Sequence, residues 1–190
     1  MEKGLTGDFI DSFLILYGVP NFMGVFSSDT IPVGKCKNRS CYSMIVNMSK
    51  QNEQGTHWIA IIVHKNMAIY FDSLSLPNAR LYKRLIENIF PKLNIYSVLK
   101  NEIPIQSLQS TFCGFYCIYA IIYFSSLTLC YHELNPPCKN VNFDDLRALL
   151  HKKSNQRKSY DMLIPLLANN PTQNDEYVIS NLSLFIRDRE

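Results

Sequence analysis

The sequence lacks the features that mark secreted, membrane-spanning and repetitive proteins. Its first eight residues hold no positively charged segment followed by an apolar run, so we expect no signal peptide. The most apolar stretch, Phe115 to Phe124, has about half the length that a membrane-spanning helix needs, and two serines follow it. Internal repeats and low-complexity tracts are also missing. These absences predict an intracellular protein that is neither secreted nor inserted in a membrane.

The composition shows little charge and enough apolar residues for a core. Of the 190 residues, 47% are hydrophobic and 18% are charged, and the net charge is +3. A chain of this length can bury a sizeable core, so disulfide bonds are not needed for folding. The mildly basic charge permits an acidic partner without requiring one. The six cysteines are Cys36, Cys41, Cys113, Cys117, Cys130 and Cys138.

Hydrophobic periodicity predicts one α+β domain. Strands are expected at Cys41–Met48, His57–His64 and Met67–Phe71, and the last two form a hairpin because a two-residue turn separates them. Residues 21–40 are expected to be loop. The other predicted elements are a helix that begins near Thr6, a strand at 95–99, and helices at 79–90, 113–127 and 142–153. We expect the domain to cover 1–168, with its core at about 20–130, and a polar tail at 169–190 that either docks or stays mobile.

Cys113 is a candidate nucleophile because it begins a long apolar helix. The first turn of a helix favours negative charge, which lowers the pKa of a thiol and raises its thiolate fraction. Gly114 beside it would let the backbone approach a substrate closely. Taken alone, however, Cys113 is explained more simply as a small core residue.

His57 and Asp72 give Cys113 a chemical context. His57 lies at the junction of a polar loop and an apolar strand, where a side chain faces a cleft rather than the core. Asp72 follows the partner strand, and the hairpin would bring it beside His57. Its carboxylate could then accept the Nδ1–H of the imidazole and stabilise the imidazolium. The alternative is a solvated aspartate that caps the next turn. His64 lies at the far end of the same strand, remote from His57.

A polar loop before Cys113 supplies a fourth candidate. Gln106 could donate its side-chain amide to a developing oxyanion, together with the backbone N–H of Cys113. Gln109 in the same loop competes for this role, and spacing alone does not separate the two. Trp58 is expected to wall the site and help to exclude water.

The order of these residues resembles a known clan of proteases. His57-Trp58, Phe71-Asp72-Ser73, Gln106 and Cys113-Gly114 resemble, in that order, the adenain-like and Ulp-type cysteine proteases. Adenovirus-type proteases are matched further at Phe22–Phe26, Ile45–Asn47 and Gly55–Trp58, so the resemblance covers roughly 20–130. It implies an α+β cysteine-protease fold with a central, mostly antiparallel sheet flanked by helices. It assigns catalysis to His57, Asp72, Gln106 and Cys113, and substrate contact to Trp58 and Gly114. It also favours Gln106 over Gln109, because the gap of seven residues from Gln106 to Cys113 fits the adenain arrangement.

Two departures from the adenain pattern affect the expected activator. Asp72 stands where adenain has glutamate, as in Ulp-type enzymes. No cysteine lies between Lys92 and Ile105, where adenain has the one that binds an activating viral peptide through a disulfide. We therefore expect no metal or organic cofactor, and a non-covalent peptide or DNA activator stays open.

The resemblance implies an endopeptidase that processes viral structural precursors and acts as a monomer in the host nucleus or the virion. The alternatives are a Ulp-type protease acting on SUMO or ubiquitin-like modifiers, a non-catalytic descendant, and a zinc module. The zinc ligands would be Cys36, Cys41, Cys113 and Cys117. A weak nucleic-acid contact is expected from Lys152, Lys153, Arg157 and Lys158, unless these cations only flank a solvated helix end.

Overall fold

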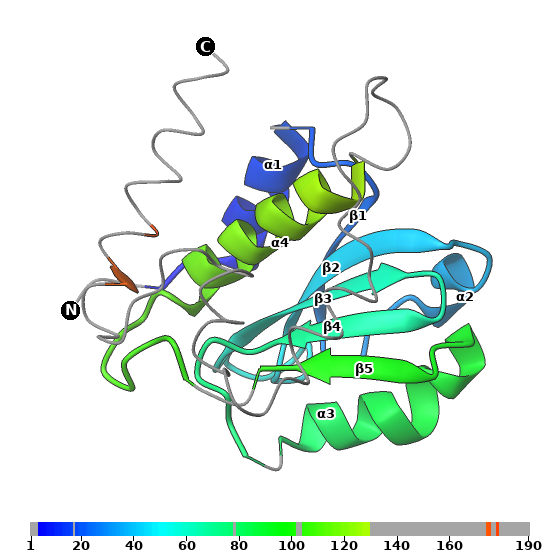
Figure 1. The fold of residues 1–190 in the computed structure, drawn as a ribbon. Helices are drawn as coiled ribbons and strands as arrows, with labels where there is room; N and C mark the ends of the chain where they lie inside the picture. Colours follow the sequence, from blue (N-terminus) through cyan, green and yellow to red (C-terminus); the bar gives the residue numbers. More distant parts are fainter. Residues whose placement is uncertain are drawn as a thin grey trace, which may run out of the picture.

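The computed structural model describes residues 4–16, 18–77, 79–101, 104–129, 174–175 and 178. The chain begins with helix α1 and then forms a five-stranded sheet with helices on both faces (Figure 1). In chain order, the elements are α1 (Gly7–Leu16), β1 (Phe22–Ser27), α2 (Val33–Cys36), β2 (Cys41–Asn47), β3 (Trp58–His64), β4 (Met67–Phe71), α3 (Arg80–Arg84), the π-helical turn η1 (Leu85–Ile89), the 3₁₀ turn η2 (Pro91–Leu93), β5 (Ser97–Lys100) and α4 (Cys113–Leu129).

The sheet has the strand order β1-β2-β3-β4-β5. The two central pairings, β2 with β3 and β3 with β4, are antiparallel, whereas both edge strands pair in parallel. The prediction of a mostly antiparallel sheet thus holds for the three central strands, and the sheet as a whole is mixed. Strand β3 is buried along its interior because it lies in the middle of the sheet with both faces covered.

Alternate residues of β3 enter two separate hydrophobic cores. Ala60 and Ile62 pack with α1 and α4 on one face, and Ile59 and Ile61 pack with α3 and η1 on the other. In Figure 1, α1 and α4 lie side by side above the sheet and α3 lies below it. Helix α4 is long and apolar because it contributes directly to the first core.

The prediction that residues 21–40 form a loop is wrong, because this segment contains β1 and α2. Gly24 contributed to this wrong prediction, because glycine is typical of turns. In the structure it adopts φ +118 beside a register shift between Phe22 and Val25, which is a bulge in a parallel edge strand. Such a strand lacks the hairpin signals that reveal antiparallel strands in a sequence.

Several expectations lie outside the described residues. These are the helix at 142–153, the extent of the domain to 168, most of the tail at 169–190 and the basic cluster at 152–158. Among the helices of the described ranges, none is long and apolar enough to cross a membrane.

The proposed zinc module is not formed. Cys36 is buried in the core on one face of the sheet, and Cys117 is buried in the core on the other. Four thiolates must surround a zinc ion at bonding distance, so cysteines separated by the sheet cannot form the site.

Candidate active site

One cleft of about 620 Å³ is lined by four of the residues that the sequence singled out. Its walls include His57, Trp58, Gln106 and Cys113, and Leu5 of the N-terminal segment contributes to the rim. Gln109 and Gly114 do not line this cleft. The described structure therefore brings Gln106, rather than Gln109, to the same space as Cys113.

His57 and Asp72 meet because of the β3–β4 hairpin. Ala60 pairs with Phe71, and extending this register places Asp72 opposite Ile59, two residues from His57. Residues in such a diagonal relation share one face of a sheet and can contact each other. His57 Nε2 lies 2.7 Å from Asp72 Oδ1, with both side chains buried. The predicted use of Nδ1 for this contact is wrong, because Asp72 is reached by Nε2.

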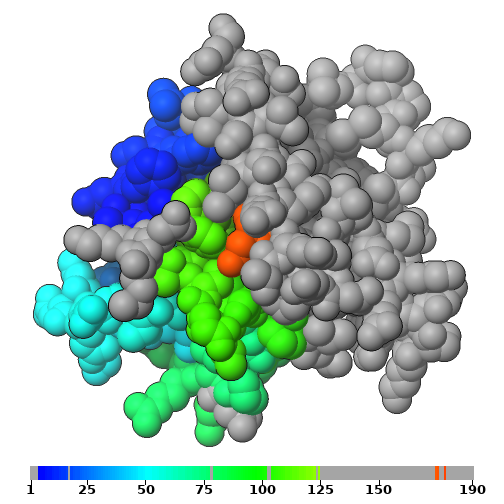
Figure 2. Space-filling view, turned by 90° about the vertical axis from the view of Figure 1, so that its left-hand side faces the viewer, coloured from blue at the N-terminus to red at the C-terminus, as the bar shows by residue number. Residues whose placement is uncertain are grey.

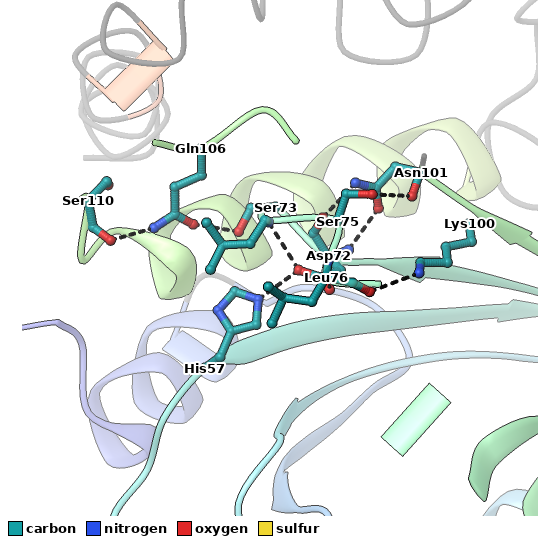
Figure 3. A network of polar contacts seen from close by, with 10 residues as sticks. His57, Asp72, Ser73, Ser75, Leu76, Lys100, Asn101, Gln106 and Ser110 are labelled. Atoms are coloured by element: carbon teal, nitrogen blue, oxygen red, sulfur yellow. Dashed lines mark hydrogen bonds and ion pairs between the residues drawn. The ribbon is translucent and has the colours of Figure 1, made fainter. Parts of the chain in front are cut away.

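Asp72 is fixed at both its carboxylate and its backbone (Figure 3). Leu74 N–H donates to Oδ1 and Leu76 N–H donates to Oδ2, each at 3.0 Å. The Asn101 side chain accepts from Asp72 N–H at 2.9 Å and donates to Asp72 C=O. Lys100 Nζ in turn donates to Leu76 C=O at 3.2 Å. The carboxylate is therefore held in one orientation.

The electrostatics of this pair favour charge on both groups. Burial of Asp72 opposes its ionisation, but the hydrogen bond and charge of His57, together with the two backbone N–H donors, lower its pKa. Burial likewise opposes protonation of His57. Hydrogen bonds and attraction from Asp72 and Cys113 outweigh this effect and raise the pKa of His57 to about 9.

Cys113 occupies the first position of α4 and hydrogen-bonds to His57. Burial would raise the pKa of its thiol. The His57 side chain and the backbone N–H groups of Trp58 and Gly114 outweigh burial and lower the pKa below the ordinary value of 9.0. Since Asp72 occupies Nε2, the imidazole nitrogen that remains for the thiol is Nδ1. The site thus shifts Cys113 toward the thiolate and His57 toward the imidazolium, each relative to its ordinary pKa.

The other described cysteines lack this environment. Burial raises the pKa of Cys36, Cys41 and Cys117, and the negative charges of Cys113 and Asp72 add to the effect at Cys117. Cys41 Sγ lies 3.0 Å from His64 Nδ1, at the opposite end of β3 from His57. A neighbouring histidine is therefore not sufficient to lower the thiol pKa. At Cys113 the hydrogen bond of His57 lowers the pKa most, and backbone N–H groups of Trp58 at the start of β3 and Gly114 in α4 add to it.

Gln106 is buried beside the cleft with both ends of its amide engaged. Ser73 Oγ donates to Oε1 at 2.6 Å, and Nε2 donates to Ser110 C=O at 2.8 Å. Gln109 is exposed, and its Oε1 accepts from Ser107 Oγ at 2.6 Å.

Trp58 and Gly114 contact the N-terminal segment, and no pattern in the sequence predicts this contact. The Trp58 indole N–H donates to Leu5 C=O at 3.0 Å. A Cβ on Gly114 would lie 3.0 Å from Leu5 Cβ and 3.2 Å from Ile10 Cδ1. Gly114 therefore allows close packing of α4 against Leu5 and Ile10, and the structure gives this contact in place of the expected approach to a substrate. Gly114 indicates in the sequence that another group approaches the backbone closely, but it does not indicate that this group is Leu5.

Asn47 shapes the loop that leads to His57, and the sequence did not assign it a role. Its Oδ1 accepts from Ser49 N–H at 2.9 Å and from Thr56 N–H at 3.3 Å. A Cβ on Gly55 would lie 2.8 Å from Asn47 Nδ2, so a larger residue at this position would displace the Asn47 amide. The Asn47 side chain thereby closes the base of the loop at 48–56.

Three described residues near the C-terminus pack against the domain, and one of them contacts Ile105 beside Gln106. Asn174 Nδ2 donates to Ile105 C=O at 2.9 Å, and Tyr116 O–H donates to Asp175 Oδ1 at 2.8 Å. Val178 is fully buried in the core that contains α4. Figure 2 shows these residues in orange beside the green part of the surface.

Comparison with known proteins places the fold. No model of a known protein family matches the sequence, and no curated protein matches it. The crystal structure of a de-sumoylating protease matches with a TM-score of 0.52 and 16% identity, covering 98% of this chain and 82% of that chain. Two crystal structures of the ASFV pS273R protease match with TM-scores of 0.45 and 0.42 at 20% and 19% identity, covering 65% of this chain. The chain spans 58% of the length of that ASFV protease. The protein therefore shares the α+β fold of that de-sumoylating protease, in agreement with the predicted fold class.

Proposed function

We propose that this protein is a cysteine protease in which Cys113 is the nucleophile, His57 the general acid and base, and Asp72 the residue that orients His57. The observation that carries the proposal is the buried 2.7 Å contact between His57 and Asp72, next to a thiol of lowered pKa that faces a cleft. A structural cysteine in a core has a raised pKa, as Cys117 does.

In this mechanism, the Cys113 thiolate attacks the carbonyl carbon of the scissile peptide bond, and the carbonyl electrons move to its oxygen. The His57 imidazolium then gives its Nδ1 proton to the leaving amine as the C–N bond breaks, which leaves an acyl thioester on Cys113. His57 next removes a proton from water. The resulting hydroxide attacks the thioester, releases the acid product and restores the thiolate.

The oxyanion receives two donors in this proposal. One is the backbone N–H of Cys113, because the first N–H groups of a helix have no acceptor within the helix. The other is the second hydrogen on Gln106 Nε2, the first being donated to Ser110 C=O. Each such donor stabilises the transition state by about 2.7–4 kcal/mol in well-studied cases.

The nucleophile is tested by labelling with iodoacetamide at about pH 6.5, where ordinary thiols are protonated and react slowly. We expect the label on Cys113, its loss in Cys113→Ala, and loss of peptide hydrolysis in the same variant. Cys41→Ala is the matched control, because Cys41 is half-buried with a raised pKa and should affect neither readout. A label that persists in Cys113→Ala on another cysteine would contradict the assignment.

For the substrate, we propose viral or virus-like structural precursor proteins, on the resemblance of Phe22–Phe26 and Gly55–Trp58 to adenovirus-type proteases. The location that goes with this proposal is the host nucleus or the virion. The absence of a cysteine in 92–105 supports a non-covalent peptide or DNA as the activator, if one is required. Activity that is insensitive to a chelator would agree with a mechanism free of metal.

A ubiquitin-like modifier is the second candidate substrate. It is favoured by the de-sumoylating protease whose fold this chain shares at a TM-score of 0.52. Incubation with capsid-type precursors and with a SUMO fusion, each with Cys113→Ala as the control, separates the candidates. Cleavage of the SUMO fusion alone would overturn the viral-precursor proposal and leave the protease proposal intact.

A further inference from the structure

Ser73 contacts Gln106 through both its backbone and its side chain, and Figure 3 shows the side-chain contact. The Ser73 carbonyl accepts from the N–H groups of Ile105 at 2.9 Å and Gln106 at 3.0 Å. The Ser73 hydroxyl donates to Gln106 Oε1 at 2.6 Å. Ser73 is fully buried and Gln106 is 2% exposed, so water does not replace these contacts. A single serine therefore holds the backbone and the amide of Gln106.

The surroundings of the Gln106 amide select one of its two orientations. Ser110 presents a carbonyl, which can only accept, so the amide end that faces it must be Nε2. Oε1 then lies at the opposite end, where it is buried and needs a donor. The Ser73 hydroxyl is that donor. A flipped amide would bring Oε1 against the Ser110 carbonyl oxygen, which repels it.

We propose that Ser73 is a positioning residue for the oxyanion site, because its hydroxyl keeps the Gln106 amide oriented with Nε2 toward the cleft. This role rests on the proposed cysteine-protease function and deepens it. Ser73 itself touches no reacting atom. Ser73 directly follows Asp72 after β4. In this proposal the two neighbours position two different side chains: Asp72 orients His57, and Ser73 orients Gln106.

The main test is the kinetics of Ser73→Ala. Loss of an oxyanion donor lowers kcat by about 10²–10³-fold, and loss of its orientation should lower kcat less, on the order of tenfold. KM should change little, because the donor acts in the transition state. The matched control is Ser107→Ala, in which the lost hydroxyl contacts Gln109 rather than Gln106 and kcat should be unchanged. An unchanged kcat in Ser73→Ala overturns the proposal.

Alkylation of Cys113 separates positioning from general damage. Iodoacetamide reacts at a saturated carbon and forms no oxyanion, so its rate reports only the thiolate and His57. We expect the rate to be unchanged in Ser73→Ala. If this variant fails to fold, Ser73→Cys keeps a similar volume with a weaker donor and should show the same fall in kcat. A loss of alkylation in a folded Ser73 variant overturns the proposal, since Ser73 would then act on Cys113 or His57.

A double-mutant cycle completes the test. If Ser73 acts through Gln106, Ser73→Ala should have no further effect on kcat in a Gln106→Ala background. A tenfold loss that persists in that background overturns the positioning role and leaves the protease proposal intact. A wild-type protein that hydrolyses no peptide and shows no selective alkylation of Cys113 overturns the protease proposal itself.

Discussion

Replacing Asp72 by asparagine removes the charge that sustains the His57 imidazolium while nearly preserving shape. The rise in the His57 pKa from 6.5 to about 9 corresponds to about 3 kcal/mol in favour of the protonated imidazole. Burial lowers this pKa, and Asp72 supplies the largest contribution that raises it. In Asp72→Asn the burial remains and the carboxylate is lost, so most of that free energy disappears. We expect kcat/KM near pH 7 to fall by about a hundredfold or more.

The pH dependence gives this prediction its sharpest readout. The wild type needs a protonated His57 and a Cys113 thiolate, so its activity should decline as pH rises through about 9 and decline again at acid pH where the thiolate is protonated. Because Asp72→Asn lowers the pKa of His57, its alkaline limit should move to lower pH. Its thiol should also be alkylated more slowly near pH 7, because the imidazolium that stabilises the thiolate is lost.

The assay measures kcat/KM and the rate of Cys113 alkylation from about pH 5 to about pH 10 for both proteins. Asparagine also places an N–H donor against one of the backbone donors of Leu74 and Leu76, which costs stability of about 1–3 kcal/mol. Thermal unfolding of both proteins checks that the variant is folded at the assay temperature. A folded Asp72→Asn with wild-type profiles would refute the role of Asp72.

Two glycine substitutions test how the site is built. Gly55→Ala places a Cβ 2.8 Å from Asn47 Nδ2, so we expect displacement of the loop that leads to His57 and a severalfold loss of kcat/KM. Gly34→Ala is the control, because a Cβ there meets nothing within 4 Å and kcat/KM should stay unchanged. Equal kcat/KM values for the two variants would contradict this prediction. Gly114→Ala should lower the free energy of unfolding by about 1–3 kcal/mol through contact with Leu5, measured by urea denaturation, and an unchanged stability would contradict this packing.

Local patterns in the sequence predict the pair that defines the site. The two-residue turn and the alternation of β3 and β4 fix a hairpin register, and this register brings Asp72 to His57. The start of α4 at Cys113 is likewise predictable, because a polar loop ends there and a long apolar run begins. The α+β class follows from the same periodicity and is confirmed by the structure.

Contacts between residues distant in the chain could not be predicted. Asn101 holds the backbone of Asp72 from 29 positions away, and nothing in its local sequence indicates this partner. The Leu5 contact with Trp58 spans 53 positions and depends on how α1 packs beside α4. The choice of Nε2 over Nδ1 in His57 depends on the orientation of its ring, which sequence spacing does not specify.

The central claim is that Cys113 forms a covalent acyl intermediate, and trapping that intermediate tests it most directly. The protein is mixed with an activated peptide ester, quenched in acid and analysed by intact and peptide mass spectrometry. We predict a mass increase equal to the acyl group, located on the peptide that contains Cys113, removed by hydroxylamine and absent in Cys113→Ala. Hydrolysis that continues at the wild-type rate in Cys113→Ala, or an acyl group on another residue, would contradict the account.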